Sequence, residues 1–320
     1  GRTPRHGRIV QLTSGTTGQP REAVRTPRAA DVADLGLGLI DRLGPTRAST
    51  ALVCTPLFHG MGLVGLGLGL FLGGHVVLRP RFDPAAVLAD AGRHGADTLV
   101  VVPEMLALLL TAGTRPATVR RVVTGGAPLR PELAEAVRRR WGDVLYNAYG
   151  TTECGIATVA TPADLRRAPG TVGRPLRGVT VGVSDDELTI AGRLSVAGAR
   201  RTGDLGVIRP DGLVMLTGRA DDLIISGGEN VHPAEVEEAI RSLPDVDDVA
   251  VAGAPDQRLG QQVVAWVVRR AGSTISADEI IGAVRAQLEA VKAPHEVRFV
   301  TALPRTELGK IRRRDLLGGL

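Results

Sequence analysis

Aromatic side chains are scarce in this sequence, which has only two Trp, two Tyr and four Phe among its 320 residues. Grooves that bind nucleic acid combine clustered positive charge with aromatic side chains on which bases stack. The net charge is +5, and no long basic block occurs. These features argue against a nucleic-acid partner and are compatible with anionic small-molecule ligands. With 43% hydrophobic residues, the chain has the composition of a globular protein, and its length favours two domains.

Lysine is almost absent as well. Of the 39 basic Lys and Arg residues only two are lysines, Lys292 and Lys310. An ammonium group is a compact point charge, whereas a guanidinium is a planar fork. In a chain that uses arginine almost everywhere, a remaining lysine is a candidate for chemistry that needs an ammonium group. The alternative is chance, and we expect it to apply to Lys292, as a solvated residue at a helix end.

The two cysteines, Cys54 and Cys154, lie far apart and have no metal-ligand spacing. They argue against a disulfide framework and favour a reducing, cytoplasmic location. No secretory signal precedes the first predicted strand. The apolar stretch from Gly60 to Leu78 is diluted by seven glycines, so we expect a buried helix followed by a strand rather than a transmembrane segment.

A glycine- and hydroxyl-rich segment follows the first predicted strand, which covers residues 8–12. It reads Thr13-Ser14-Gly15-Thr16-Thr17-Gly18. Glycines let a backbone approach a ligand closely, and successive N–H groups in such a turn bind anions. The segment therefore predicts a phosphate-binding loop, although it lacks the Gly-Lys-Ser/Thr of the common P-loop. An ordinary polar turn is the alternative.

Strands and helices alternate through the first two-thirds of the chain. The predicted strands cover 51–55, 75–79, 98–102, 119–124 and 144–149, and the predicted helices lie within 62–72, 84–92, 104–110 and 131–141. This alternation predicts a parallel sheet with helices on both faces. Short β runs follow from Gly173, including a hairpin around Pro210-Asp211-Gly212, and then comes a compact α+β pattern. It has helices over 233–242 and 277–290 and strands over 248–252, 263–269 and 296–300. The expected fold class is α/β, with a large N-terminal parallel-sheet core that includes a β-rich subdomain and a small mobile α+β C-terminal domain.

Several segments together carry a resemblance to a known family. They are TSGTTGQPRE at 13–22, PLFHGMG at 56–62, GGAPL at 125–129, YGTTE at 149–153, RTGD at 201–204, GRADD at 218–222, SGGEN at 226–230 and PRTELGK at 304–310. In this order they resemble the signatures of the adenylate-forming acyl- and aryl-CoA synthetases, and the match runs from residue 8 to the C-terminus. The resemblance implies an AMP-binding adenylation core over 1–220 and a mobile C-terminal domain over 221–320. It also implies ATP, Mg²⁺ and coenzyme A as ligands.

The resemblance also implies roles for single residues. The loop of Thr13, Ser14, Gly15, Thr16, Thr17 and Gly18 would hold the β- and γ-phosphates of ATP. The nucleotide pocket would add Gly125, Gly126, Ala127, Tyr149, Gly150, Thr151, Asp204 and Arg219. The catalytic group would comprise Lys310, Thr152, His59 and Glu153, with Glu153 also the Mg²⁺ ligand. The C-terminal domain would pivot at Asp221, and Gly227, Gly228 and Glu229 would line the thiol tunnel.

Two departures from the family pattern stand out. Almost nothing precedes the phosphate loop, so we expect a short or N-terminally truncated member in which part of the acid pocket is missing. Arg21 and Glu22 replace the usual lysine and glycine, and Glu22 brings a negative charge near the polyphosphate.

We therefore expect an ATP-dependent acid–CoA ligase. One alternative is an acyl-AMP ligase that loads a carrier-protein phosphopantetheine, and another is a non-catalytic nucleotide-binding protein. The presence of Lys310 and Glu153 argues against the non-catalytic alternative, while Glu22 and the short N-terminus argue for it. The expected acid is fatty or aromatic, because Met61, Gly62, Ala127 and Pro128 offer no carboxylate to an amino group. The sequence does not indicate the oligomeric state.

Overall fold

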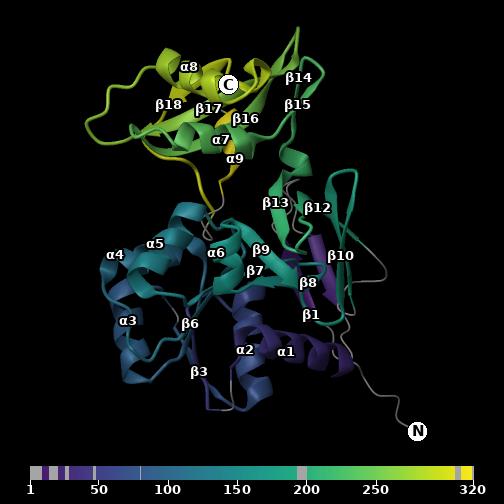
Figure 1. Cartoon of the computed structure of the whole chain (residues 1–320), viewed down its shortest axis with the longest axis vertical. Helices are drawn as coiled ribbons and strands as arrows, with labels where there is room; N and C mark the ends of the chain where they lie inside the picture. The colour runs from purple at the N-terminus through teal and green to yellow at the C-terminus, as the bar shows by residue number, and fades with distance from the viewer. Residues whose placement is uncertain are drawn as a thin grey trace. The chain divides into compact units, whose positions relative to one another are not determined.

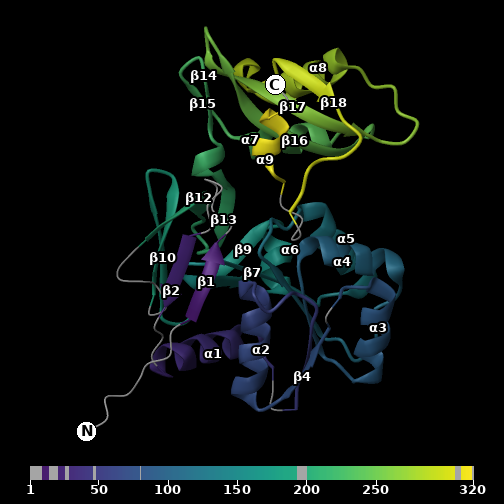
Figure 2. The same ribbon diagram turned by 180° about the vertical axis from the view of Figure 1, so that it is seen from behind.

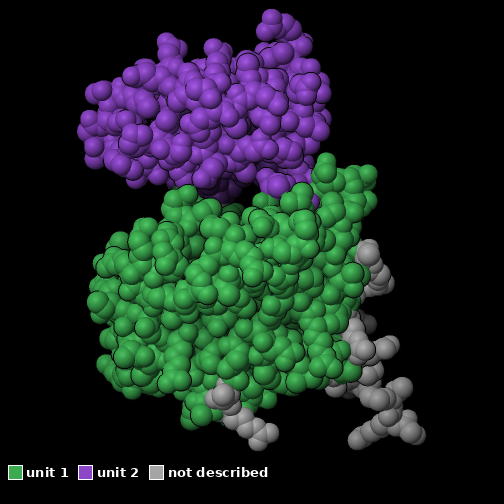
Figure 3. Space-filling view, in the orientation of Figure 1, with its two compact units in different colours: residues 1–202, 207–216 green, residues 203–206, 217–320 purple. Residues whose placement is uncertain are grey.

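The computed structural model describes residues 9–13, 21–25, 29–45, 48–79, 81–192, 200–306 and 311–318, and the side chains from residue 30 onward within these ranges. The chain forms two compact units (Figure 3). The first comprises Gly1–Thr202 and Val207–Leu216, and the second comprises Gly203–Gly206 and Thr217–Leu320.

The first unit begins with an antiparallel pair of strands, β1 (Ile9–Thr13) and β2 (Arg21–Arg25), visible in Figure 2. Helix α1 (Ala29–Leu43) follows. Strands and helices then alternate: β3 (Thr50–Val53), α2 (Gly60–Leu72), β4 (His75–Leu78), α3 (Pro84–Arg93), β5 (Thr98–Val101), α4 (Pro103–Ala112), β6 (Arg121–Gly125), α5 (Pro131–Trp141) and β7 (Leu145–Thr151). Strands β4, β3, β5, β6 and β7 are adjacent in that order and parallel, as the alternation predicts.

Antiparallel strands extend this sheet beyond β7. They are β8 (Gly155–Ala160), β9 (Thr171–Pro175), β10 (Val179–Ser184), β11 (Glu187–Gly192), β12 (Arg200–Ile208) and β13 (Val214–Arg219), with α6 (Pro162–Arg167) between β8 and β9. The order across the eleven-stranded sheet is β10-β11-β12-β13-β9-β8-β7-β6-β5-β3-β4. The β-rich part therefore starts at Gly155, earlier than the predicted change at Gly173, because β8 turns back directly on β7.

The two faces of the parallel sheet have separate cores, since successive strand residues point to opposite sides. Leu52, Leu99 and Val122 pack with α3, α4 and α5, whereas their neighbours Val53, Val100 and Val123 pack with α1 and α2. Figure 1 shows these two groups of helices on opposite sides of the strands. The central strand β5 is buried on both faces, which explains its largely apolar sequence Thr-Leu-Val-Val, whereas the edge strand β4 is partly exposed.

The second unit is a smaller α+β body. Its elements are η1 (Ala220–Asp222), β14 (Ile224–Ser226), β15 (Glu229–Val231), α7 (Pro233–Arg241), β16 (Val246–Asp256), β17 (Gly260–Arg269), α8 (Ala277–Gln287), η2 (Ala290–Lys292), β18 (Glu296–Phe299) and α9 (Arg313–Leu317). The sheet order is β15-β14-β17-β16, with β18 parallel to β17. Helices α7 and α8 cover one face, and α9 packs with Trp266 on the other.

Local sequence accounts for many element ends. The Asp83 side chain accepts a hydrogen bond from the backbone N–H of Ala86 at 2.7 Å, and Pro84 occupies the first turn of α3. Ser276 and Glu279 form a capping box at the start of α8.

The structure confirms the expected α/β fold class and the reading of Gly60–Leu78 as a helix and a strand, α2 and β4. No helix in the described ranges is long and apolar enough to cross a membrane. Cys54 and Cys154 are both buried and free. Helix α1 was not predicted, and neither were the short elements α6 and α9.

Candidate active site

The carboxyl ends of β3, β6 and β7 meet at one edge of the parallel sheet. The segment with His59 follows β3, the turn at Gly126 follows β6, and the turn with Glu153 follows β7. Ligands of open α/β sheets bind at this edge. The fold thus brings three separately predicted segments to the position where a ligand is expected.

The turn after β6 depends on two glycines for different reasons. Gly125 lies opposite Ala148 of β7, and a Cβ there would lie well under 3.0 Å from the Ala148 carbonyl oxygen and 3.0 Å from Met61 Sδ. Gly126 has φ +81°, a left-handed conformation that favours glycine, but no neighbouring backbone crowds it. Gly125 therefore allows a close approach of two strands, and Gly126 allows the chain to turn, so that Ala127 follows half-buried.

The turn from β7 to β8 carries the predicted Tyr-Gly-Thr-Thr-Glu signature. A Cβ at Gly150 would lie well under 3.0 Å from the Gly155 carbonyl oxygen, so glycine is needed for the strands to pair. The Thr151 hydroxyl accepts a hydrogen bond from the Cys154 N–H at 3.2 Å, which closes the turn. Thr152 is half-buried and Glu153 is exposed. The Glu153 carboxylate is therefore exposed in the turn that follows the carboxyl end of β7.

Tyr149 has a more enclosed position than its predicted role requires. The residue is 9% exposed and packs in a cluster with Cys154, Val172 and Leu188. Only a small part of the ring is open to a nucleotide. Stacking of Tyr149 on adenine stays a prediction.

His59 marks the start of α2. Its backbone is extended, and its carbonyl oxygen accepts the first helical hydrogen bond, from Leu63 N–H at 3.0 Å. Its ring lies 4.3 Å from the ring of Phe58, which is 69% exposed. The half-buried His59 thus stands at the same edge as Gly126 and Glu153, next to an exposed aromatic ring.

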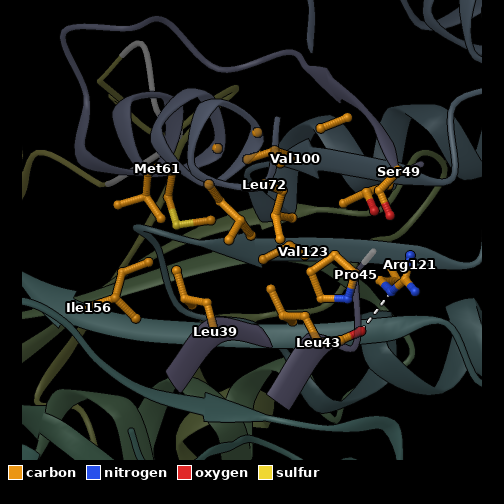
Figure 4. Close-up of a pocket in the computed structure, with 16 residues that line it drawn as sticks. Leu39, Leu43, Pro45, Ser49, Met61, Leu72, Val100, Arg121, Val123 and Ile156 are labelled. Carbon is orange, nitrogen blue, oxygen red and sulfur yellow. Dashed lines mark hydrogen bonds between the residues drawn. The ribbon is translucent and has the colours of Figure 1, made fainter. Parts of the chain in front are cut away.

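An apolar cavity of about 40 Å³ lies between α1, α2 and the sheet. Figure 4 shows Leu39 and Leu43 of α1, Met61 and Leu72 of α2, and Val100, Val123 and Ile156 of the strands around it. Arg121 is at the opposite end from Met61, where its Nε donates to the Leu43 carbonyl oxygen at 2.6 Å. Because Met61 also contacts the Gly125 position, the cavity begins directly behind the turn after β6.

Asp204 and Arg219 form an ion pair in the second unit, with Arg219 Nη1 2.8 Å from Asp204 Oδ1. Arg219 Nη2 also lies 3.3 Å from Asp221 Oδ2. Gly203, with φ +73°, leaves room for the guanidinium, since a Cβ there would be 3.0 Å from Nη2. Burial lowers the pKa of Arg219, but the hydrogen bond to Asp204 and the charges of Asp204 and Asp221 outweigh it, so the pKa lies above its usual value. In this structure the two predicted ribose-side residues satisfy each other.

The predicted thiol-tunnel residues form the tip of a hairpin in the second unit. β14 and β15 pair antiparallel with Ser226 opposite Glu229, so Gly227 and Gly228 are a two-residue turn. Their φ angles are +60° and +88°, as a type I′ turn requires at both central positions. Both glycines and Glu229 are exposed.

Two predicted groups lie outside the described residues: the loop residues Ser14–Gly18 and the catalytic candidate Lys310. Thr13 is the last residue of β1 and is opposite Arg21, so the strands flanking residues 14–20 are paired. The other lysine, Lys292, lies in η2 and donates to Glu235 Oε2 at 2.9 Å. This hydrogen bond raises the pKa of Lys292.

Among the described residues, no group of three or more His, Cys, Asp or Glu side chains forms a preassembled metal site. Mg²⁺ at a nucleotide site is bound by one or two carboxylates together with phosphate oxygens and water. A single exposed carboxylate at the sheet edge, Glu153, fits that requirement.

The profile of the family described as AMP-binding enzyme matches residues 2–201, and that of its C-terminal domain matches residues 235–310. The chain belongs to the AMP-binding enzyme family.

Relatives in this AMP-binding family include the sulfoacetate–CoA ligase of Cupriavidus necator, 34% identical over 97% of this chain and 66% of its own length. The indoleacetate–CoA ligase of Aromatoleum aromaticum is 33% identical over 96% of this chain and 66% of its own length. The chain therefore spans slightly less than two-thirds of these relatives.

Solved structures at about 30% sequence identity match nearly all of this chain. ATP-bound MatB from Rhodopseudomonas palustris gives a TM-score of 0.89 at 30% identity, over 97% of this chain and 67% of MatB. The o-succinylbenzoate–CoA synthetase MenE of Bacillus subtilis, in complex with ATP and magnesium ion, gives 0.85 at 30% identity, over 96% of this chain and 69% of MenE.

The sequence did not reveal the functional surroundings of these residues. The partnership of Arg219 with Asp204 and Asp221 has no sequence signal except the nearby acidic residues. The cavity behind Gly125 has a weak signal, the apolar spacing of Leu35, Leu39 and Leu43 that could have identified α1.

Proposed function

We propose that the protein is an ATP-dependent acid–CoA ligase. A substrate carboxylate attacks the α-phosphorus of ATP and pyrophosphate leaves, which forms an acyl-adenylate. The thiol of coenzyme A then attacks the acyl carbon, AMP leaves, and a thioester forms. The observation that carries this proposal is the gathering of His59, Gly126 and Glu153 at the carboxyl edge of the parallel sheet. The CoA ligases among the relatives support it.

We propose roles for single residues from the family resemblance. The exposed Glu153 carboxylate would hold Mg²⁺, which supplies charge neutralisation at the phosphates. Thr152 and the 13–18 loop would donate hydrogen bonds to phosphate oxygens, on which charge accumulates as pyrophosphate leaves. Asp204 would accept hydrogen bonds from ribose hydroxyls, and its ion pair with Arg219 would rearrange so that Arg219 faces the ribose or the α-phosphate.

Lys310 would contact both the acid and the α-phosphate during adenylation. Because it belongs to the C-terminal part of the chain, as do Gly227, Gly228 and Glu229, we propose that residues 221–320 rotate about Asp221 between the two half-reactions. Hinges of this kind are a few residues that absorb the backbone change.

We propose that the acid is fatty or aromatic. The cavity behind Gly125 is lined almost entirely by apolar side chains, and Met61 lies between the cavity and the turn. An ammonium group in such surroundings would be unpaired and costly to bury. The related ligases act on acids as different as sulfoacetate and indoleacetate, so the cavity is the stronger guide.

Coenzyme A and a carrier protein present the same phosphopantetheine arm, so the two half-reactions are tested separately. Acid-dependent exchange of labelled pyrophosphate into ATP tests adenylation with a panel of fatty, aryl and amino acids. Thioester formation with coenzyme A and with a loaded carrier protein then tests the acceptor. No exchange with any acid would favour a non-catalytic nucleotide-binding protein.

A matched pair of variants links the activity to the site. Glu153→Gln should slow exchange by roughly a hundredfold, as loss of a single electrostatic contact to the reacting phosphates commonly does. Asp41→Asn removes a carboxylate from another exposed position, at the end of α1 in the same unit, and should leave exchange unchanged. Equal rates for the two variants would remove Glu153 from the site.

A further inference from the structure

Arg313, at the start of α9, links three other parts of the second unit. Its Nη1 lies 2.9 Å from Asp222 Oδ2, its Nη2 lies 2.7 Å from Glu237 Oε1, and its Nε donates to the Val251 carbonyl oxygen at 3.0 Å. These acceptors come from η1, α7 and β16. The side chains of Arg313, Asp222 and Glu237 are 25%, 29% and 9% exposed, so the contact with Glu237 is buried and the contact with Asp222 is partly shielded from water.

Glu237 accepts a second hydrogen bond within this network. Glu237 Oε1 also accepts the Val251 N–H at 2.9 Å, so arginine, carboxylate and strand form a closed set of hydrogen bonds. Burial lowers the pKa of Arg313, and the charges of Glu237 and Asp222 raise it by more, so its pKa lies above the usual value. Arg313 therefore stays charged, and its planar fork suits several simultaneous acceptors.

Two neighbouring carboxylates bind different arginines. Asp221 lies 3.3 Å from Arg219, whereas Asp222 lies 2.9 Å from Arg313. Arg313 thus joins Asp222 to the body formed by α7, β16 and α9. The two sets of ion pairs therefore separate between Asp221 and Asp222.

Arg313 also follows Lys310 by three residues. The described residues on either side of 307–310 form a common base, because Arg305 and Ile311 form an antiparallel bridge and Arg312 N–H donates to the Pro304 carbonyl oxygen at 2.9 Å. Arg305 is in addition paired with Asp248 of β16. One side chain, Arg313, connects this base to the residue beside the proposed hinge.

We propose that Arg313 is a positioning residue that couples the hinge at Asp221 to the segment that carries Lys310. The inference rests on the proposed function, since it assigns Lys310 to adenylation. With the Asp222–Arg313 pair intact, a backbone change at Asp221 moves the base of the Lys310 segment as part of one body. Without the pair, that base is less tightly linked to the pivot, and Lys310 loses its orientation toward the reactants.

The test compares half-reactions in variants of the full chain. Asp222→Asn keeps the Arg313–Glu237 contact and should lower kcat for pyrophosphate exchange about tenfold with little change in KM for ATP, the signature of lost positioning in the transition state. Thioester formation from supplied acyl-adenylate should change less than about twofold, because Lys310 takes no part in it. Asp222→Glu restores the charge and should recover most of the exchange rate.

Arg313→Gln and Arg314→Gln provide a matched comparison, because Arg314 is the next residue of α9 and is exposed. Arg313→Gln should reproduce the selective loss, Arg314→Gln should not, and Asp222→Asn should add nothing to Arg313→Gln, as expected for two residues that act through one contact. Equal losses in both half-reactions, or equal effects of the two arginine variants, would overturn the proposal.

Amide hydrogen exchange separates this inference from the proposed function. In Asp222→Asn, peptides covering 220–223 and 311–318 should both exchange faster than in the wild type, since they share the contact. Faster exchange at 220–223 alone would overturn the coupling, whether or not the enzyme is active. Failure of the wild type to exchange pyrophosphate with any acid would instead refute the proposed function.

Discussion

Replacing Gly125 with alanine should destabilise the first unit far more than the same replacement at Gly126. In Gly125→Ala the new Cβ would lie well under 3.0 Å from the Ala148 carbonyl oxygen, which is backbone and has no rotamer to change. Overpacking of this kind costs about 1–3 kcal/mol. Separating β6 from β7 to relieve it weakens ladder hydrogen bonds worth about 1 kcal/mol each. The expected loss is about 3 kcal/mol.

Gly126→Ala provides the control one residue away. The nearest atom to its Cβ is Met61 Cγ at 3.8 Å, an ordinary contact. The remaining cost is the left-handed backbone, about 1 kcal/mol. Both variants add one methyl group to the same turn, so a difference between them reports the strand contact alone.

Thermal unfolding followed by circular dichroism measures this difference. For a unit of this size, 1 kcal/mol shifts Tm by about 2–4 °C, so Gly125→Ala should lower Tm by about 6–12 °C and Gly126→Ala by about 2–4 °C. If both variants shift Tm equally, or if Gly125→Ala unfolds within about 2 °C of the wild type, the close approach of Gly125 to β7 does not limit stability.

Three further predictions concern the site and the core. Lys310→Ala should abolish pyrophosphate exchange yet spare thioester formation from supplied acyl-adenylate. Asp221→Pro, by fixing φ, should slow thioester formation far more than exchange. Equal damage to both steps in Lys310→Ala would contradict the proposed rotation between the two half-reactions. Glu22→Gly should lower KM for ATP at low salt without changing KM for the acid, and an unchanged KM for ATP would place Glu22 outside the site. Burial raises the pKa of Cys54 to about 12 from 9.0, so its thiol should resist alkylation in the folded protein at pH 8. Because only the unfolded thiol ionises between these two values, Tm should fall as pH rises through that window, and Cys54→Ala should reduce the fall; rapid alkylation of native Cys54 would contradict its burial.

The sequence predicted the parallel sheet because its local and tertiary signals agree. Thr98–Val101 is buried on both faces, and its residues Leu99–Val101 read as an unbroken apolar run. Pro84 and Pro131 mark the first turns of α3 and α5, where a missing N–H has no cost. Helices and strands were therefore predictable wherever a few consecutive residues indicate both the burial of the element and the place where it begins.

Helix α1 shows where this local reading failed. Gly36 and Gly38 lower its helix propensity by roughly 1 kcal/mol each relative to alanine. Both glycines are explained by distant neighbours, since a Cβ at Gly36 would lie 2.8 Å from the Phe71 ring, and one at Gly38 would lie 3.2 Å from Arg177 N. The helix forms because packing of Leu39 and Leu43 offsets this cost, and packing depends on residues that are remote in the sequence.

For the candidate site, the residue types were predictable from ordered motifs, whereas their partners were not. A carboxylate in an Arg-Thr-Gly-Asp segment gives no indication that Asp204 pairs with Arg219, fifteen residues later. The hairpin at Gly227 and Gly228 was not predicted either, although two consecutive glycines are typical of a type I′ turn.

The role of Arg313 could not be predicted from the sequence either. Arg313 is the middle residue of three consecutive arginines, Arg312, Arg313 and Arg314, and nothing in the sequence distinguishes it from its neighbours. Arg312 precedes α9, and Arg313 and Arg314, as consecutive helix residues, point about 100° apart, so these two cannot both face the body of the unit directly. Arg313 is the arginine that contacts the body of the unit, and its acceptors Asp222 and Glu237 lie 91 and 76 residues away in the sequence. Arg312 instead pairs with the nearby Asp315 and is 54% exposed. Since a charge is buried stably only where opposite charges meet it, the choice among identical arginines depends on the fold rather than on the local sequence. The same dependence makes Arg313→Gln and Arg314→Gln informative as a pair, because they differ only in what the fold places beside them.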